Sequence, residues 1–122
     1  DFSEIVLALT EDRGADVVIE TVGSATFASS LRSLAQFGRL VLLGEVAGKP
    51  VELNLAEIIF RDAQVLGSSG VSRSVIEQVA DMVSNGQVKP VVGGSMPLEE
   101  AARAFDLLSG RSVLGRLVLT AR

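Results

Sequence analysis

The sequence of 122 residues is long enough for one hydrophobic core, and its 48% hydrophobic residues and mean hydropathy of +0.42 are typical of a globular domain. A net charge of -4, scattered cations and the absence of Trp and Tyr argue against nucleic acid as a partner. Because the sequence contains neither Cys nor His, it can form no disulfide and lacks the side chains that zinc sites and nucleophile–base pairs use first.

Helix and strand patterns alternate from the start of the chain, with an amphipathic helix predicted over residues 4–10 and a strand over 16–20. Apolar residues toward both faces of this strand are typical of a central strand in a parallel sheet. Helical spacing of apolar residues predicts a helix over 25–35, and a second strand over 39–43 follows. Gly38 stands between them, where a helix-to-strand turn needs a permissive residue. The alternation predicts an α/β protein.

The middle of the chain continues this alternation. Asn54 is a suitable N-cap for a helix over residues 55–61, and a third strand is predicted over 65–67. Ser74 and Glu77 have the spacing of a capping box at the start of the clearest helical pattern in the chain. The apolar stripe of that helix consists of Ile76, Val79, Ala80 and Val83.

The last part of the chain is predicted to be a helix–strand extension. Gly86 ends the preceding helix, and the extended segment 88–92 contains a proline, which is typical of an edge or crossing segment. Pro97 opens another helix, which stops at Gly110, and a final strand is predicted over 114–120. The inward face of this helix is expected to consist of Ala101, Ala102, Phe105 and Leu108.

Six segments, taken in their order and spacing, resemble the C-terminal part of the medium-chain dehydrogenase/reductase superfamily, which contains zinc-type alcohol dehydrogenases and quinone oxidoreductases. The segments are Gly14–Glu20, Gly38–Gly44, Leu66–Ser68, Gly86–Val91, Pro97–Ala101 and Gly115–Leu119. The resemblance implies a partial doubly wound parallel sheet, formed by the last three strands of a Rossmann fold. Residues 1–70 would be the C-terminal half of the dinucleotide-binding domain, and residues 71–122 a segment that returns to the catalytic domain.

The resemblance also implies a cofactor and a reaction for the parent protein. NAD or NADP would exchange a hydride with an alcohol, a carbonyl or an activated alkene of a small-molecule substrate. The sequence contains no G-x-G-x-x-G turn for the pyrophosphate, so we expect the chain to be the later part of such an enzyme. Zinc is possible in the parent, with its ligands in the catalytic domain and none in this chain. We expect no catalytic residue here, no membrane partner and a cytoplasmic location.

Ten residues are candidates for contact with the cofactor. Three short segments follow predicted strands at the edge where open parallel sheets hold ligands, and the resemblance places them against the nicotinamide end of the cofactor. It also places Arg116 near the phosphates or ribose. The segments are Thr21, Val22 and Gly23; Leu43, Gly44 and Glu45; and Ser68, Ser69 and Gly70. The alternative for each segment is an ordinary turn, and for Arg116 an exposed surface cation.

Of three other interpretations, two need a glycine-rich turn that the sequence lacks. Glu20, an acid at a strand end, could bind an adenosine ribose if its strand were the second of the sheet, but the required glycine-rich turn is absent. A methyltransferase-like domain would need a similar turn. The chain could instead be an oligomerisation module, because relatives in the superfamily dimerise through the sixth strand, here residues 64–68. The strand over 16–20 would have an unpaired edge, which we expect the rest of the polypeptide or a second copy to cover.

Overall fold

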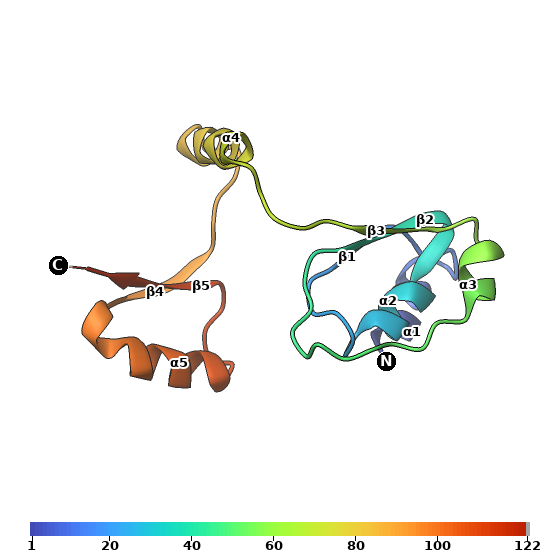
Figure 1. The fold of residues 1–122 in the computed structure, drawn as a ribbon, viewed down its shortest axis with the longest axis horizontal. Helices are drawn as coiled ribbons and strands as arrows, with labels where there is room; N and C mark the ends of the chain where they lie inside the picture. The colour runs from blue at the N-terminus through green and yellow to red at the C-terminus, as the bar shows by residue number, and fades with distance from the viewer. Residues whose placement is uncertain (122) are drawn as a thin grey trace. The chain divides into compact units, whose positions relative to one another are not determined.

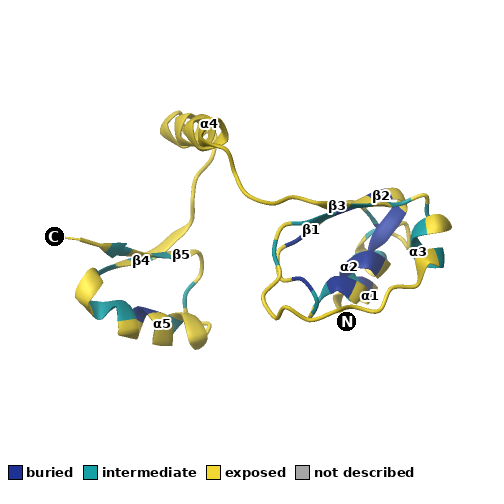
Figure 2. Ribbon diagram, viewed as in Figure 1, coloured by how far each residue is buried: buried dark blue, intermediate teal, exposed yellow. Residues whose placement is uncertain are grey.

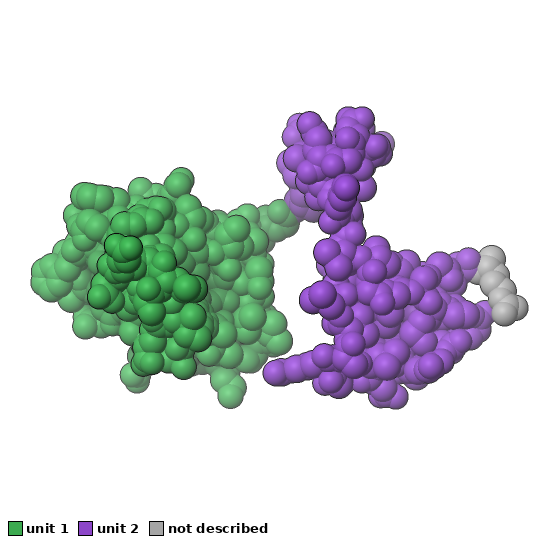
Figure 3. All heavy atoms as spheres, turned by 180° about the vertical axis from the view of Figure 1, so that it is seen from behind, with its two compact units in different colours: residues 1–70 green, residues 71–122 purple. Residues whose placement is uncertain are grey.

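The computed structural model describes residues 1–121, which form two compact units (Figures 1 and 3). The first unit is Asp1–Gly70, and the second begins at Val71. Each unit has its own parallel strand pairing. No helix in the described part of the chain is long and apolar enough to cross a bilayer.

Three parallel strands form the sheet of the first unit, as the sequence predicts. They are β1 (Ala15–Glu20), β2 (Leu34–Leu42) and β3 (Gln64–Gly67), in the order β1-β2-β3. In the register of the sheet, Glu20 pairs with Leu42, and Leu42 pairs with Gly67. The last residues of the three strands therefore lie in one row, and the three following loops start from the same edge of the sheet.

Helices cover one face of this sheet. They are α1 (Phe2–Leu9), α2 (Phe27–Arg32) and α3 (Leu55–Ile59), and Asn54 caps α3 as predicted. The core lies between the sheet and α2, and Ile58 of α3 packs against its edge. Figure 2 shows the buried residues concentrated in α2 and the first part of β2. The core residues are Phe27, Leu31, Leu34 and Leu40, of which Leu40 has no exposed surface.

The opposite face of the sheet is exposed, which corrects the expectation that β1 is buried on both faces. Val18 packs against the core, whereas Ile19 is 64% exposed and Val17 is also exposed. Within the described residues β1 pairs only with β2. The expectation of an unpaired β1 edge in this chain is thus confirmed, and the apolar residues of β1 are suited to neighbours that this chain does not supply.

The passage from α2 to β2 differs from its prediction. The helix ends at Arg32 and β2 begins at Leu34, so the helix is shorter and the strand longer than expected. The left-handed residue there is Phe37, with φ of 61°, and not Gly38. Gly38 is required by close approach, because a Cβ at this position would lie 2.8 Å from the carbonyl oxygen of Ala35.

The second unit consists of α4 (Arg73–Ser84), β4 (Val92–Pro97), a short 3-10 helix (Leu98–Glu100), α5 (Ala101–Ser109) and β5 (Arg116–Thr120). The strands β4 and β5 pair in parallel. The sequence analysis missed β4, because Gly93 and Gly94 have low strand propensity and a proline precedes them.

Two helix details in the second unit also correct the predictions. Ser72, not Ser74, caps α4, since its side chain accepts a hydrogen bond from the Val75 amide. The buried residue of α5 is Ala104, whereas Phe105 is 69% exposed, so the helix is rotated relative to the predicted face. A small residue at the contact lets α5 lie close to the two-stranded sheet.

Candidate functional site

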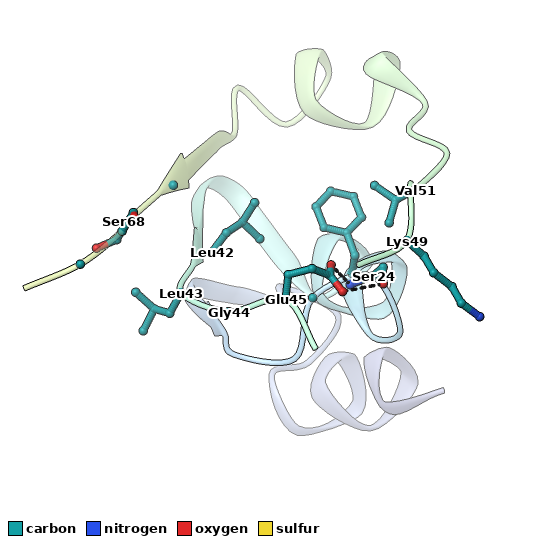
Figure 4. Close-up of a pocket in the computed structure, with 13 residues that line it drawn as sticks. Ser24, Leu42, Leu43, Gly44, Glu45, Lys49, Val51 and Ser68 are labelled. Atoms are coloured by element: carbon teal, nitrogen blue, oxygen red, sulfur yellow. Dashed lines mark hydrogen bonds between the residues drawn. The ribbon is translucent and has the colours of Figure 1, made fainter. Parts of the chain in front are cut away.

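A pocket of about 670 Å³ lies where the loops after β1, β2 and β3 meet (Figure 4). This is the carboxyl edge of the parallel strands, the usual place for a ligand in an open α/β sheet. Its volume is in the range of small-molecule sites. The lining residues are Gly23, Ser24, Phe27, Leu42, Leu43, Gly44, Glu45, Lys49, Val51, Gly67, Ser68, Ser69 and Gly70.

The structure brings seven of the ten predicted site residues together in this pocket. One comes from the loop after β1, three follow β2 and three follow β3: Gly23; Leu43, Gly44 and Glu45; and Ser68, Ser69 and Gly70. Thr21 and Val22 instead line a separate hollow beside β1. Arg116 belongs to the second unit, where it starts β5 and its amide donates to the carbonyl oxygen of Val91 at 2.8 Å.

Two glycines allow the loops to approach each other closely. Gly23 has φ of 91°, in the left-handed region, and a Cβ there would overlap the Glu45 side chain. A Cβ on Gly44 would overlap the carbonyl oxygen of Thr21. The loops after β1 and β2 can therefore form adjacent walls of the pocket only because both positions lack a side chain.

Glu20 is a buried carboxylate behind this edge, with 3% of its surface exposed. The Val22 and Gly23 amides donate to its Oε1 at 2.7 and 3.0 Å. The hydroxyls of Thr26 and Ser30 also donate to the carboxylate. Burial raises the pKa of Glu20, but hydrogen bonds from Ser30, Gly23, Val22 and Thr26 outweigh it and lower the pKa to about 2.

These contacts give Glu20 a role that the sequence analysis did not assign. The carboxylate stabilises the turn that follows it in the sequence and leads into the pocket. Its oxygens accept hydrogen bonds from the residues of that turn and of α2. The structure thus favours an internal role over the ribose-binding alternative. The clue in the sequence was an acid at the end of an apolar strand, followed within ten residues by Thr26 and Ser30.

Glu45 is an exposed carboxylate at the rim of the pocket that connects two loops. The Ser24 amide donates to its Oε2 at 2.7 Å, and the Ser24 hydroxyl donates to its Oε1 at 2.9 Å. The amides of Ala47 and Gly48 both donate to Oε1 at 2.8 Å. The bonds from the Ser24 backbone and side chain, followed by those from Gly48 and Ala47, lower the pKa of Glu45. The carboxylate is therefore ionised at neutral pH.

Six lining residues were not predicted as site residues. Ser24 and Gly67 immediately adjoin predicted ones, so a wider window around each strand end would have included them. Phe27 and Leu42 are largely covered residues whose remaining surface forms the floor, and Lys49 and Val51 come from the loop after β2. Loop residues of this kind carry no periodic pattern, and their place in the pocket depends on the path of the loop.

The described residues do not fit a metal site. No group of three or more His, Cys, Asp or Glu side chains converges within residues 1–121. The complete sequence contains no Cys or His. We therefore derive no step of chemistry through a metal bound to this chain.

Comparison with known proteins places these observations in a family. The family model described as "Zinc-binding dehydrogenase" matches residues 1–119. Acryloyl-coenzyme A reductase of Metallosphaera sedula is 34% identical over 106 residues, which cover 86% of this chain and 32% of that protein.

Solved structures are similar over nearly the whole chain. An NAD-dependent alcohol dehydrogenase has 33% identity and a TM-score of 0.80, with 98% of this chain and 35% of that chain covered. The alcohol dehydrogenase of the archaeon Aeropyrum pernix has 27% identity and a TM-score of 0.87, with 98% and 34% covered. The chain thus spans about a third of the length of these relatives. From the matched segments, the parallel sheet and these similarities together, this chain belongs to the zinc-binding dehydrogenase family of the medium-chain dehydrogenase/reductase superfamily.

Proposed function

We propose that this chain forms the nicotinamide side of the cofactor site in an NAD(P)-dependent oxidoreductase. The whole enzyme would transfer a hydride between the nicotinamide and an alcohol, a carbonyl or an activated alkene. The observation that carries the proposal is the pocket at the shared carboxyl edge of β1, β2 and β3. Membership of a dehydrogenase family supports the same function over that of a methyltransferase.

The chemistry proposed for this chain is positioning. When bound, the nicotinamide supplies the reactive hydride, and the protein supplies its orientation and surroundings. Gly23 and Gly44 let the loops after β1 and β2 lie close together beside the ring, and the segment from Ser68 to Gly70 offers main-chain hydrogen-bonding groups other than the Ser68 amide, which donates to Leu42. Thr21 and Val22 would support this wall from the neighbouring hollow, and Arg116 would approach the phosphates or ribose.

The domain assignment belongs to the same proposal. Residues 1–70 would be half of a dinucleotide-binding domain, and residues 71–122 would return to a catalytic domain. The contact pattern supports this division, because the first compact unit ends at Gly70. A cytoplasmic location is part of the proposal and is supported by the absence of Cys in the sequence.

Nicotinamide mononucleotide provides a direct test of the pocket. The sequence lacks a pyrophosphate turn, so we expect weak, millimolar-range binding, measured by NMR titration of the 15N-labelled chain. Amide shifts in the first unit should be confined to the residues around Gly23, Gly44 and Ser68. Calorimetry with NADH should detect no binding in the micromolar range. The absence of shifts at these strand ends would contradict the proposal.

Gly67→Val supplies a variant that fills the pocket without disturbing the fold. Gly67 lines the pocket, a Cβ there would meet nothing within 4 Å, and Val is favoured in strands. We expect this variant to raise the dissociation constant of the mononucleotide by about tenfold or more. A loss of about 1.4 kcal/mol in binding free energy corresponds to a tenfold change. Gly110→Ala is the matched control, because its Cβ makes ordinary contacts outside the pocket. Equal binding by both variants would count against the pocket.

A second candidate function is self-association through the sheet. It is favoured by the unpaired β1 edge and by the exposed apolar side chains of Val17, Ile19 and Leu66. Analytical ultracentrifugation should then show a dimer that Ile19→Asp shifts toward monomer. Val46→Asp, a change at an 80% exposed loop residue, should leave the dimer unchanged. A wild-type monomer at all concentrations would rule this function out.

A further inference from the structure

The hydrogen-bond donors at one end of the pocket are already used by Glu45. Two donors of Ser24 and the amides of Ala47 and Gly48 all point to its carboxylate. Clusters of backbone amides such as this one are the usual binding places for phosphate. With the carboxylate in place, these four donors are not available to an incoming phosphate, and a negative charge is held among them.

No cation neutralises this charge among the described contacts of Glu45. Lys49 also lines the pocket, but Figure 4 shows its side chain extending away from the Glu45 carboxylate, and none of the ion pairs among the described residues involves Glu45. The two hydrogen bonds from Ser24 hold the Glu45 carboxylate at the rim of the pocket (Figure 4). Close to the carboxylate, and away from the Lys49 ammonium, the local field therefore favours a positively charged ligand group over a neutral group of the same shape.

We propose that Glu45 is a specificity-determining residue that favours the oxidised, cationic nicotinamide over the reduced, neutral one. This inference rests on the proposed function of the pocket. The oxidised ring carries one positive charge, and hydride transfer adds a proton and two electrons to it, which makes the ring neutral. A fixed carboxylate beside the ring stabilises the first form and has little effect on the second. Glu45 would thus bias the relative affinity for the two cofactor states.

Two small ligands of nearly the same shape, one neutral and one cationic, test whether the pocket prefers a positive charge. Nicotinamide itself is neutral, whereas nicotinamide methylated on the ring nitrogen is a permanent cation of nearly the same shape. NMR titration of the 122-residue chain with each probe gives two dissociation constants, and their ratio measures the preference for charge. We expect the cation to bind about two- to fivefold more tightly, the range for interactions between exposed charges.

Two variants at the rim distinguish the charge of Glu45 from its structural role. Glu45→Gln removes the charge, and we expect the two probes to bind equally. Ser24→Ala removes one bond to the carboxylate but keeps the charge, so the preference should remain. Glu52→Gln, in the same exposed loop outside the pocket, is the control for a change in net charge and should behave as wild type.

The outcomes separate this inference from the proposed function. Binding of neither probe at the strand ends would overturn both. Binding of both probes with equal affinity to the wild-type chain would overturn the role of Glu45 and leave the proposed function standing. Loss of the preference in Ser24→Ala as well as in Glu45→Gln would assign the effect to loop order and would likewise overturn it.

Discussion

Replacing Glu20 by Gln is expected to lower the free energy of unfolding at neutral pH by about 3 kcal/mol. The pKa of Glu20 is about 2 in the folded chain, against an ordinary value of 4.5, so ionisation of this carboxyl favours the folded chain by about that amount, which the uncharged glutamine cannot supply. Glutamine keeps the size of the side chain, but it places an NH2 group against donors such as Ser30. Urea denaturation of the wild-type chain and of the Glu20→Gln variant at pH 7 measures the difference in the free energy of unfolding.

The pH dependence of folding stability follows from the direction in which the pKa of Glu20 shifts on folding. Because the pKa is lower in the folded state, the stabilisation is fully present above about pH 4.5 and is lost as the pH falls through the folded pKa near 2. The Glu20→Gln variant should lack this part of the acid sensitivity. Glu52→Gln is the matched control at an exposed glutamate. Equal losses in the two variants would show that Glu20 has no special role.

Leu40→Ala is expected to lower the free energy of unfolding by about 2–5 kcal/mol, the range for removing a large aliphatic side chain from a packed core. Leu40 has no exposed surface and packs in the cluster of Phe27, Leu31 and Leu34. This cluster is small, so little else can compensate for the cavity. The denaturant midpoint of the full chain provides the measurement.

Leu66→Ala is the control for Leu40, because it makes the same chemical change in the same sheet. Leu66 is 43% exposed, and we expect its replacement by Ala to lower the free energy of unfolding by less than about 1 kcal/mol. If both changes cost the same, the core of the first unit would not be where the structure places it.

The sequence predicted the parallel sheet and the edge that carries the site. Val17 to Ile19, Leu40 to Leu43 and Val65 to Leu66 are apolar runs bounded by glycine or by polar residues, and each lies in a strand of the structure, except that β2 ends at Leu42. Parallel strands bring their carboxyl ends to one edge, so residues such as Gly44 and Ser68 could be placed in one pocket from their positions alone.

Other features depend on tertiary contacts that no local pattern reveals. Phe37 adopts a left-handed conformation while its amide donates to the carbonyl oxygen of Arg61 at 2.7 Å. A pattern-based analysis assigns such a conformation to the neighbouring Gly38. The strand with two glycines, β4, owes its existence to pairing with β5. The internal role of Glu20 likewise requires knowing where the side chains of Thr26 and Ser30 lie.

The three strand ends that pair in the sheet should tolerate substitution very differently, because Glu20 anchors a turn, Leu42 packs partly against the core, and a side chain at Gly67 would meet open space. A side chain introduced at Gly67 should thus change what the pocket binds at little cost to stability, whereas a change at Glu20 should destabilise the turn that leads into the pocket.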